Sequence, residues 1–367
     1  MISLLIKPAS SSCNIGCKYC FYKATCKEKE EESHGIMSLD ILEKIIKKAY
    51  QDAENYCAFS FQGGEPTLVG ISFFEKVIEF EKKYNKKGIK TMNSIQTNGI
   101  LIDEDWAKFF KKNNFLVGLS IDGPKELHDL NRVDYDNKGT FDRVMNAKKL
   151  FDKYNVEYNV LSVITSATVE KTNDLYKFYK ENNIDFVQLI PCLDEGFNQK
   201  NENSSLKQSE YAKILKDIFD IWYEDYKKGE QVSIRLFENI CAVILGYEAE
   251  SCEMRGYCSV QNVIEANGDI YPCDFYVSDD KKIVNIKDIR FKNIMKQKKA
   301  ISFVKERLVV NEKCKTCKYG VLCKGGCKRY RVEGSTEYYF CDTFTDFYDY
   351  TVERFIKVCQ DIKQREE

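Results

Sequence analysis

Short apolar runs alternate with amphipathic stretches along the first two thirds of the chain. The apolar runs have the length and the Val, Ile and Phe content of buried strands. They predict strands at residues 2–6, 57–61, 90–96, 116–121, 156–163 and 186–190. Apolar positions with helical spacing predict helices between these strands, at residues 39–53, 72–84, 104–113, 140–154 and 169–181. Strands that alternate with helices in this way form a parallel sheet covered by helices, so we predict an α/β fold.

Turn-forming polar residues follow most of the predicted strands. The sequence Gln-Gly-Gly-Glu-Pro occupies residues 62–66 after the second strand, and Thr-Asn-Gly occupies residues 97–99 after the third. In a parallel barrel, active sites gather at these C-terminal strand ends. Gly, Asn and Pro also form ordinary tight turns, and that simpler interpretation stays open for most of these residues.

The pattern changes after a predicted helix at residues 208–226. Residues 252–341 carry eight cysteines, short apolar runs and an Asn267-Gly268 hairpin signal in place of the strand–helix alternation. Because this segment offers little apolar core, we expect metal centres to hold it together. A last helix is predicted at about 343–362. We therefore divide the chain into a barrel at 1–230, a linker helix region at 231–251, a cysteine-rich domain at 252–345 and a C-terminal helix at 346–367.

Composition narrows the class of protein. The 56 Lys and Arg nearly balance the 57 Asp and Glu, so the chain lacks the basic surplus of a nucleic-acid binder. No apolar run is long enough to span a bilayer. The first apolar run meets Lys7 and Pro8 too early to form a signal peptide. We expect a cytoplasmic protein that has neither nucleic acid nor a membrane as its partner.

The 16 cysteines need an explanation of their own in such a chain. The cytosol keeps thiols reduced, which favours metal or iron–sulfur ligation over disulfides, although disulfides remain the alternative. Five cysteines are scattered, and we expect them to be buried reduced thiols. They are Cys26, Cys57, Cys192, Cys241 and Cys359.

Three cysteines, Cys13, Cys17 and Cys20, form a Cx3CxxC motif directly after the first predicted strand. We call them the N-terminal triad. Three thiolates leave one iron of a four-iron cubane without a protein ligand, as catalytic metal sites keep one position open. The amine and carboxylate of S-adenosylmethionine (SAM) can chelate that iron, and reductive cleavage of SAM then yields a radical that abstracts hydrogen. The spacing alone is equally compatible with part of a zinc site.

The context of the triad resembles the radical SAM superfamily. Tyr19 lies within the motif, aromatic residues follow it, and Gly-Gly-Glu-Pro ends the second predicted strand. The resemblance implies a partial (β/α)6 TIM-like barrel of radical SAM type. It also implies that the strand end binds the amino group of SAM, through the backbone of Gly63 and Gly64 and the charge of Glu65.

The C-terminal cysteines resemble the iron–sulfur SPASM domain of peptide-modifying radical SAM enzymes. A CxxC pair, a Gly-Gly turn and a trailing cysteine carry this resemblance. It implies two further clusters, and hence three [4Fe–4S] clusters in all. The first auxiliary set is Cys252, Cys258, Cys273 and Cys327, and the second auxiliary set is Cys314, Cys317, Cys323 and Cys341. A pair of four-cysteine zinc ribbons is the alternative.

Nearly the whole chain resembles the anaerobic sulfatase-maturating enzymes. The shared stretches are SLLIKPASS, FQGGEPTL, QTNG, GLSIDGPKELHDLNR and YPCDFY. The resemblance implies an enzyme that oxidises a Cys or Ser of a partner sulfatase to Cα-formylglycine, with an electron donor such as flavodoxin or ferredoxin. It implies a general base at Asp274. It implies SAM contacts at Tyr19, Gly64, Ser120, Arg132 and Leu193.

These parts belong together chemically. Oxidation of the side chain removes a hydrogen atom, a proton and an electron, and a carboxylate within hydrogen-bond reach takes the proton. Asp274 follows cluster ligand Cys273, so the proton acceptor would lie beside the electron acceptor. A mere turn residue is the alternative for Asp274. For the whole chain, the alternatives are a SPASM-type maturase that crosslinks ribosomal peptides and a non-catalytic iron–sulfur electron carrier or redox sensor.

Overall fold

The computed structural model describes residues 1–27, 29–193 and 204–366, which form two compact units. The first unit contains Met1–Ile121, His128–Asn159 and Ser259–Val304, and the second contains Asp122–Leu127, Val160–Cys258 and Lys305–Glu367. These units divide the chain differently from the linear ranges predicted above. Residues 259–304 of the predicted cysteine-rich domain pack with the N-terminal strands.

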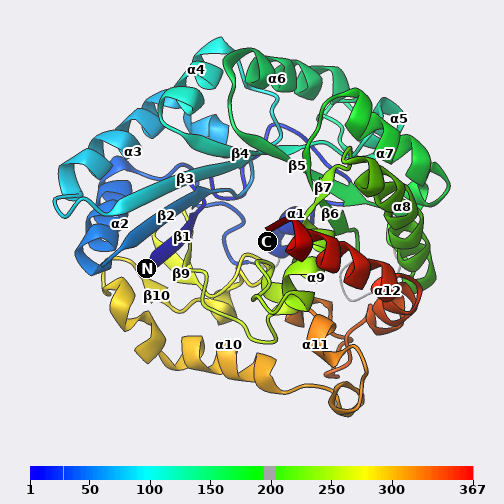
Figure 1. Cartoon of the computed structure of the whole chain (residues 1–367). Helices are drawn as coiled ribbons and strands as arrows, with labels where there is room; N and C mark the ends of the chain where they lie inside the picture. Colours follow the sequence, from blue (N-terminus) through cyan, green and yellow to red (C-terminus); the bar gives the residue numbers. More distant parts are fainter. Residues whose placement is uncertain (28, 194–203, 367) are drawn as a thin grey trace. The chain divides into compact units, whose positions relative to one another are not determined.

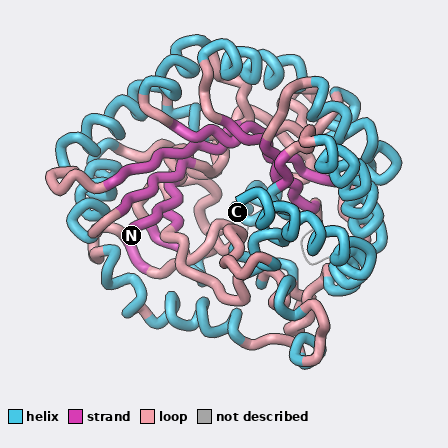
Figure 2. Tube along the Cα trace, in the orientation of Figure 1, coloured by secondary structure: helices cyan, strands magenta, loops and turns pink. Residues whose placement is uncertain are grey.

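The first unit is built on four parallel strands, as the alternating pattern predicts. They are β1 (Ile2–Ile6), β2 (Tyr56–Phe61), β3 (Lys90–Thr97) and β4 (Phe115–Ser120), paired in that order. The helices α2 (Leu39–Asp52), α3 (Ile71–Tyr84), α4 (Glu104–Lys112) and α6 (Phe141–Tyr154) connect or follow them. Figures 1 and 2 show these helices along one side of the strands.

Local signals in the sequence explain where these helices begin. Ser38 caps α2 by accepting a hydrogen bond from Ile41 N, and Asp103 caps α4 by accepting from the first backbone N–H groups. Buried aromatic rings then fix the helices against the strands. Phe61 of β2 lies 5.0 Å from Phe74 of α3, measured between ring centroids. The pattern of capped, amphipathic helices on a buried sheet follows from the sequence.

The hairpin predicted at Asn267-Gly268 is present and extends the sheet beyond β1. Its pairing with β1 was not predicted from the sequence. The strands β8 (Val263–Ile264) and β9 (Asp269–Tyr271) pair antiparallel around the predicted Asn267-Gly268 turn, and β10 (Val284–Asn285) pairs with β9. In addition, β8 pairs parallel to β1, with Leu5 opposite Val263. The cysteine-rich segment therefore brings its hairpin to the edge of the N-terminal sheet.

The second unit combines three parallel strands with a group of packed helices. Most of β5 (Tyr158–Ile164), all of β6 (Phe186–Pro191) and β7 (Ser233–Ile234) pair in that order. The helices are α7 (Thr172–Glu181), α8 (Gln208–Lys228), α9 (Arg235–Ile244), α11 (Gly320–Cys323) and α12 (Cys341–Glu366). The last helix packs on α8 and α9, where Phe355 lies 4.6 Å from Phe219. It therefore completes a core rather than forming an appendage.

Besides the four-residue α11, three helices among the described residues fall where the sequence pattern predicted none. The helices α1 (Phe21–Lys27) and α5 (Lys125–Asn131) have seven residues each, too few for a 3.6-residue period to be recognised. The third, α10 (Lys298–Leu308), lies within the cysteine-rich segment. Within the described residues, no helix combines the length and the apolar composition that crossing a bilayer requires.

Candidate functional site

The N-terminal triad lies in the loop after β1, and backbone hydrogen bonds hold this loop in place. Gly16 N donates to Val133 O at 2.8 Å, and Lys18 N donates to Asn131 O at 3.0 Å. All three thiols are partly buried. Burial is the main cause that raises the pKa of Cys13 to about 12, and the neighbouring Glu65 and triad thiols contribute to the same rise. A thiolate at this position therefore needs a nearby cation, which suits a ligand of iron.

The Gly-Gly-Glu turn, residues 63–65, packs directly on the residues that precede Cys13. Gly64 N donates to Ser10 O and Glu65 N donates to Ser12 O, both at 2.8 Å. A Cβ atom on Gly64 would lie 1.9 Å from Ser12 O, so no other residue fits without moving the backbone. Glycine at this position is thus required by the close approach of two loops, one of which carries the triad.

Glu65 is 1% exposed, and protein donors surround its carboxylate. Oε1 accepts hydrogen bonds from Thr67 N, Thr67 Oγ1 and Thr97 Oγ1, and Oε2 accepts from Asn98 N. Burial raises the pKa of Glu65, while the bonds from Thr67 and Asn98 oppose that shift. Three protein donors therefore occupy Oε1 and one occupies Oε2. Glu65 thereby ties the end of β2 to the end of β3.

Besides the residues of the Gly-Gly-Glu turn, three predicted SAM contacts lie in the first unit and one lies in the second. The Arg132 guanidinium lies over the Tyr19 ring, 5.6 Å from its centroid. Ser120, at the end of β4, accepts a hydrogen bond from Gln96 Nε2 at 2.9 Å. Leu193 follows β6 in the second unit and is the last described residue before 194–203. Their contacts with SAM stay predictions.

Asp274 lies just beyond β9, and polar side chains from the neighbouring strand ends hold it. Lys7 Nζ, after β1, is 2.6 Å from Asp274 Oδ1, and Gln62 Nε2, after β2, donates to Oδ2 at 2.7 Å. Asp274 N donates to Gln261 Oε1 at 3.1 Å. Sequence reasoning missed Lys7 and Gln62. A polar residue directly after each of two apolar strands was the available signal.

A second buried carboxylate, Glu265, anchors the segment that follows the triad. Its oxygens accept hydrogen bonds from Tyr22 Oη, from Lys29 Nζ at 3.0 Å and from Ser10 Oγ at 2.8 Å. Burial alone would raise the pKa of Glu265, but Lys7, Lys29 and these hydroxyl donors together hold it below its usual value. The network joins the hairpin, the end of β1 and the segment after the triad, and nothing in the sequence pattern pointed to it.

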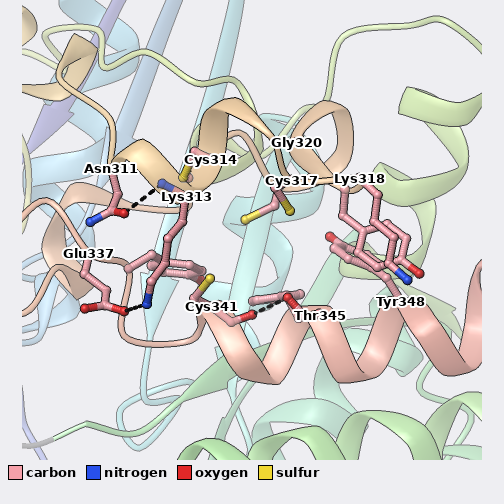
Figure 3. Close-up of a pocket in the computed structure, with 15 residues that line it drawn as sticks. Asn311, Lys313, Cys314, Cys317, Lys318, Gly320, Glu337, Cys341, Thr345 and Tyr348 are labelled. Atoms are coloured by element: carbon pink, nitrogen blue, oxygen red, sulfur yellow. Dashed lines mark hydrogen bonds and ion pairs between the residues drawn. The ribbon is translucent and has the colours of Figure 1, made fainter.

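In the second unit, the second auxiliary set lines a cavity of about 290 Å³. We call it the cysteine cavity. Figure 3 shows the side chains of Cys314, Cys317 and Cys341 around it, with Lys313 held by Glu337 at 2.8 Å. Burial raises the pKa of Cys323, the fourth cysteine, to about 12. A ring of thiols around a cavity fits a cubane, in which each cysteine binds a different iron.

The arrangement is less suited to a single zinc ion. Four thiolates on one tetrahedral zinc stand about 3.8 Å apart, given Zn–S bonds of about 2.3 Å. Across the described part of the chain, no three His, Cys, Asp or Glu side chains are gathered so as to hold one ion. The chemistry of the donor set therefore fits iron–sulfur clusters.

The first auxiliary set draws on both units. Cys252, Cys258 and Cys327 belong to the second unit, and Cys273 belongs to the first. Four of the scattered cysteines are buried, as expected: Cys57, Cys192, Cys241 and Cys359. The side chain of Cys26 lies outside the described residues.

Comparison with known proteins identifies the family. Residues 8–180 match the Radical SAM superfamily, and residues 252–318 match an iron–sulfur cluster-binding domain, SPASM. The cysteine-type anaerobic sulfatase-maturating enzyme of Clostridium perfringens (strain ATCC 13124) is 47% identical over 367 residues, which cover 99% of each chain. This chain belongs to the anaerobic sulfatase-maturating enzyme family.

More distant and structural relatives agree with this family. The serine-type anaerobic sulfatase-maturating enzyme of Bacteroides thetaiotaomicron is 31% identical over 347 residues, which cover 89% of this chain and 83% of that one. The solved structure "Native anSMEcpe with bound AdoMet and Cp18Cys peptide" has a TM-score of 0.94 and 48% identity. It covers 98% of this chain and 99% of that chain.

These findings confirm several predictions made from sequence. The fold class is α/β, a partial barrel of radical SAM type with a C-terminal SPASM domain. The protein is a radical SAM enzyme, and SAM and iron–sulfur clusters are its cofactors. The number of clusters and the ligands of each stay predictions.

Proposed function

We propose that this enzyme oxidises a cysteine side chain of a partner sulfatase to Cα-formylglycine under anaerobic conditions, in the reducing cytoplasm. The position of Asp274 carries the proposal, because this carboxylate is held at the ends of β1 and β2, the strand ends that also hold the triad loop. Cysteine is favoured over serine as the substrate residue because identity is 47% to the cysteine-type relative and 31% to the serine-type relative.

Three [4Fe–4S] clusters would serve this reaction. The N-terminal triad would hold the SAM-binding cluster, and the first and second auxiliary sets would each hold a fully ligated one. When bound, SAM and its cluster supply a hydrogen-abstracting radical, and the auxiliary clusters supply an electron acceptor. The residues that would line SAM are Tyr19, Gly63, Gly64, Glu65, Ser120, Arg132 and Leu193.

Glu65 would act in SAM binding mainly by shaping the turn. Its carboxylate already accepts hydrogen bonds from Thr67, Thr97 and Asn98. Asn98 Nδ2 in turn lies 3.7 Å from Cys13 Sγ. The same chain of contacts therefore fixes the Gly63-Gly64 backbone and the first triad cysteine, so that backbone C=O groups of the turn can accept from the amine of the ligand.

Asp274 would accept the proton of the substrate thiol. Lys7 and Gln62 each approach one of its two oxygens, which aims the carboxylate and still leaves acceptor sites free. The carboxylate is buried, so solvent competes little for those sites. A positioned base of this kind typically contributes about two to four orders of magnitude in rate. Electrons would enter through a carrier such as flavodoxin or ferredoxin.

Mass spectrometry of matched peptides tests the proposal. The anaerobically reconstituted enzyme is incubated with SAM, dithionite and a sulfatase peptide that carries Cys, Ser or Ala at the target position. We expect a hydrazide-reactive aldehyde from the Cys peptide, a slower reaction with Ser and none with Ala. A Cys peptide that loses hydrogen but stays unreactive to hydrazide would instead indicate a crosslinked product. SAM cleavage without any peptide product would contradict the proposed substrate.

A further inference from the structure

Arg307, in the last turn of α10, is a buried cation in the second unit. Only 1% of its surface is exposed, and it is among the largest fully buried side chains in the described residues. The guanidinium keeps its charge at every accessible pH. A charge removed from water at such a site is strongly destabilising unless an anion accompanies it.

The described protein atoms satisfy the hydrogen bonding of Arg307 only in part. Nη2 donates to the carbonyl oxygens of Lys324 and Gly326, both at 2.7 Å. Nη1 is buried and has no hydrogen-bond partner. Among the residues with described side chains, no carboxylate forms an ion pair with Arg307. The charge therefore lacks its anion.

A thiol of the second auxiliary set lies close to this guanidinium. A Cβ atom built on Gly325 would be 3.6 Å from Cys314 Sγ and 3.9 Å from Arg307 Nη1, so these two atoms are at most 7.5 Å apart. Cys314 belongs to the second auxiliary set.

Other basic side chains around the cysteine cavity already have partners. Lys313 pairs with Glu337 at 2.8 Å and Lys318 pairs with Asp349 at 2.5 Å. These pairs are exposed to solvent, which screens them. Arg307 is different because it is buried and unpaired, so its field acts on the thiols through a medium of low dielectric constant.

We propose that Arg307 is the counter-charge of the cluster that the second auxiliary set would hold, and that it raises the reduction potential of that cluster. A cubane with four thiolate ligands has a net negative charge and becomes more negative when it accepts an electron, so a fixed cation favours the reduced form. The inference rests on the proposed function. The substrate loses a hydrogen atom to the SAM-derived radical, a proton to the Asp274 carboxylate and one electron to an auxiliary cluster. A protein electron carrier later oxidises that cluster.

Potentials of the auxiliary clusters test the role of Arg307. The measurement is an anaerobic redox titration followed by electron paramagnetic resonance, in protein whose N-terminal triad is replaced by alanine so that only auxiliary clusters contribute. Arg307→Lys keeps the charge, and Arg307→Gln removes it while keeping hydrogen-bond donors. Arg354→Gln is the matched control, because Arg354 is paired with Asp220 at 2.7 Å and stacks on Phe219.

We expect Arg307→Gln to weaken electron uptake by an auxiliary cluster at least tenfold, which is about 59 mV for a one-electron couple. Arg307→Lys should show less than half of that shift, and Arg354→Gln none. If Arg307→Gln fails to take up auxiliary iron while Arg307→Lys takes it up, the result also supports the proposal, because the cluster then requires the positive charge. Equal potentials in the Lys and Gln variants, or loss of iron from both, would overturn the proposal.

Two further measurements distinguish a failure of this proposal from a failure of the proposed function. Iron analysis of the triad-free protein reports whether the auxiliary clusters form, and the peptide assay reports whether formylglycine is made. Full auxiliary iron with no peptide aldehyde would refute the proposed function alone. Full iron and formylglycine, with potentials that do not depend on Arg307, would refute the counter-charge alone.

Discussion

Replacing Asp274 by Asn tests how the enzyme handles the substrate proton. Asn keeps the shape of the side chain but cannot take up a proton at neutral pH. Its oxygen can face Lys7 Nζ or Gln62 Nε2, but its amide group must then face the other donor, so one of the contacts at 2.6 and 2.7 Å is lost. We expect formylglycine production to fall about a hundred- to ten-thousandfold.

The same substitution also leaves Lys7 without its carboxylate. Lys7 is 1% exposed, and removing one partner of a buried ion pair costs about 3–5 kcal/mol of folding free energy. The double variant Lys7→Met with Asp274→Asn removes both charges and should recover only part of this loss, because Glu265 then loses the neighbouring charge of Lys7. Urea unfolding of the anaerobic holoenzyme measures the stability of each variant. Comparing the single and double variants separates the loss of the base from the loss of the pair.

The decisive assay is the ratio of peptide aldehyde to 5′-deoxyadenosine, measured together by anaerobic chromatography and mass spectrometry. The hydrogen bonds that hold the triad loop do not include Asp274, so SAM cleavage should continue while the aldehyde disappears. The double variant should be equally uncoupled despite its better stability. If Asp274→Asn forms the aldehyde at near the wild-type rate, another group takes the proton and our assignment is wrong.

Three further predictions concern the triad and its surroundings. Replacing the N-terminal triad by alanine should remove about a third of the iron, on the basis of three four-iron clusters, and all 5′-deoxyadenosine; residual cleavage would contradict the assignment. Gly64→Ala should destabilise the fold by about 1–3 kcal/mol in urea unfolding and reduce triad iron, because the new Cβ meets Ser12 O at 1.9 Å, whereas Gly16→Ala meets nothing closer than 3.6 Å and should be tolerated. Glu265→Gln should reduce the free energy of unfolding by about 3–5 kcal/mol near pH 7, because it removes the anion of a buried ion pair. The folded-state pKa of Glu265 is lowered, so this advantage of the wild type should be present above the unfolded pKa of about 4.3 and shrink as the pH falls further; a difference independent of pH would refute the charge argument.

Much of the fold could be predicted from the sequence because the relevant signals are local. The strand predicted at residues 2–6 has the same bounds as β1, and the helix predicted at 39–53 ends within one residue of α2. Hydrophobic period, capping residues and turn formers act over a few positions, so they can be recognised without knowing what packs against them. The triad spacing and the Gly-Gly-Glu turn were recognisable for the same reason.

Only the tertiary structure decided which distant residues meet. Gln62 and Asp274 are 212 positions apart, and they come into contact because β8 pairs with β1 and brings the hairpin to the edge of the sheet. No periodic pattern encodes such a pairing. The pairing of β8 with β1 depends on the total apolar surface that is buried when two faces of the protein pack together.

Because tertiary packing brings distant residues together, the identity of a residue does not by itself reveal its role. Sequence marked Glu65 as a charge offered to a ligand, whereas the fold surrounds its carboxylate with protein donors. Arg307 carried no signal at all, since a lone arginine near a helix end is usually solvated. Whether a charged side chain is hydrated, paired or buried without a partner depends on the residues that surround it. Those residues come from distant parts of the chain. The sequence by itself therefore determined the elements and the ligand types of this enzyme, and tertiary packing decided the electrostatic surroundings in which they act.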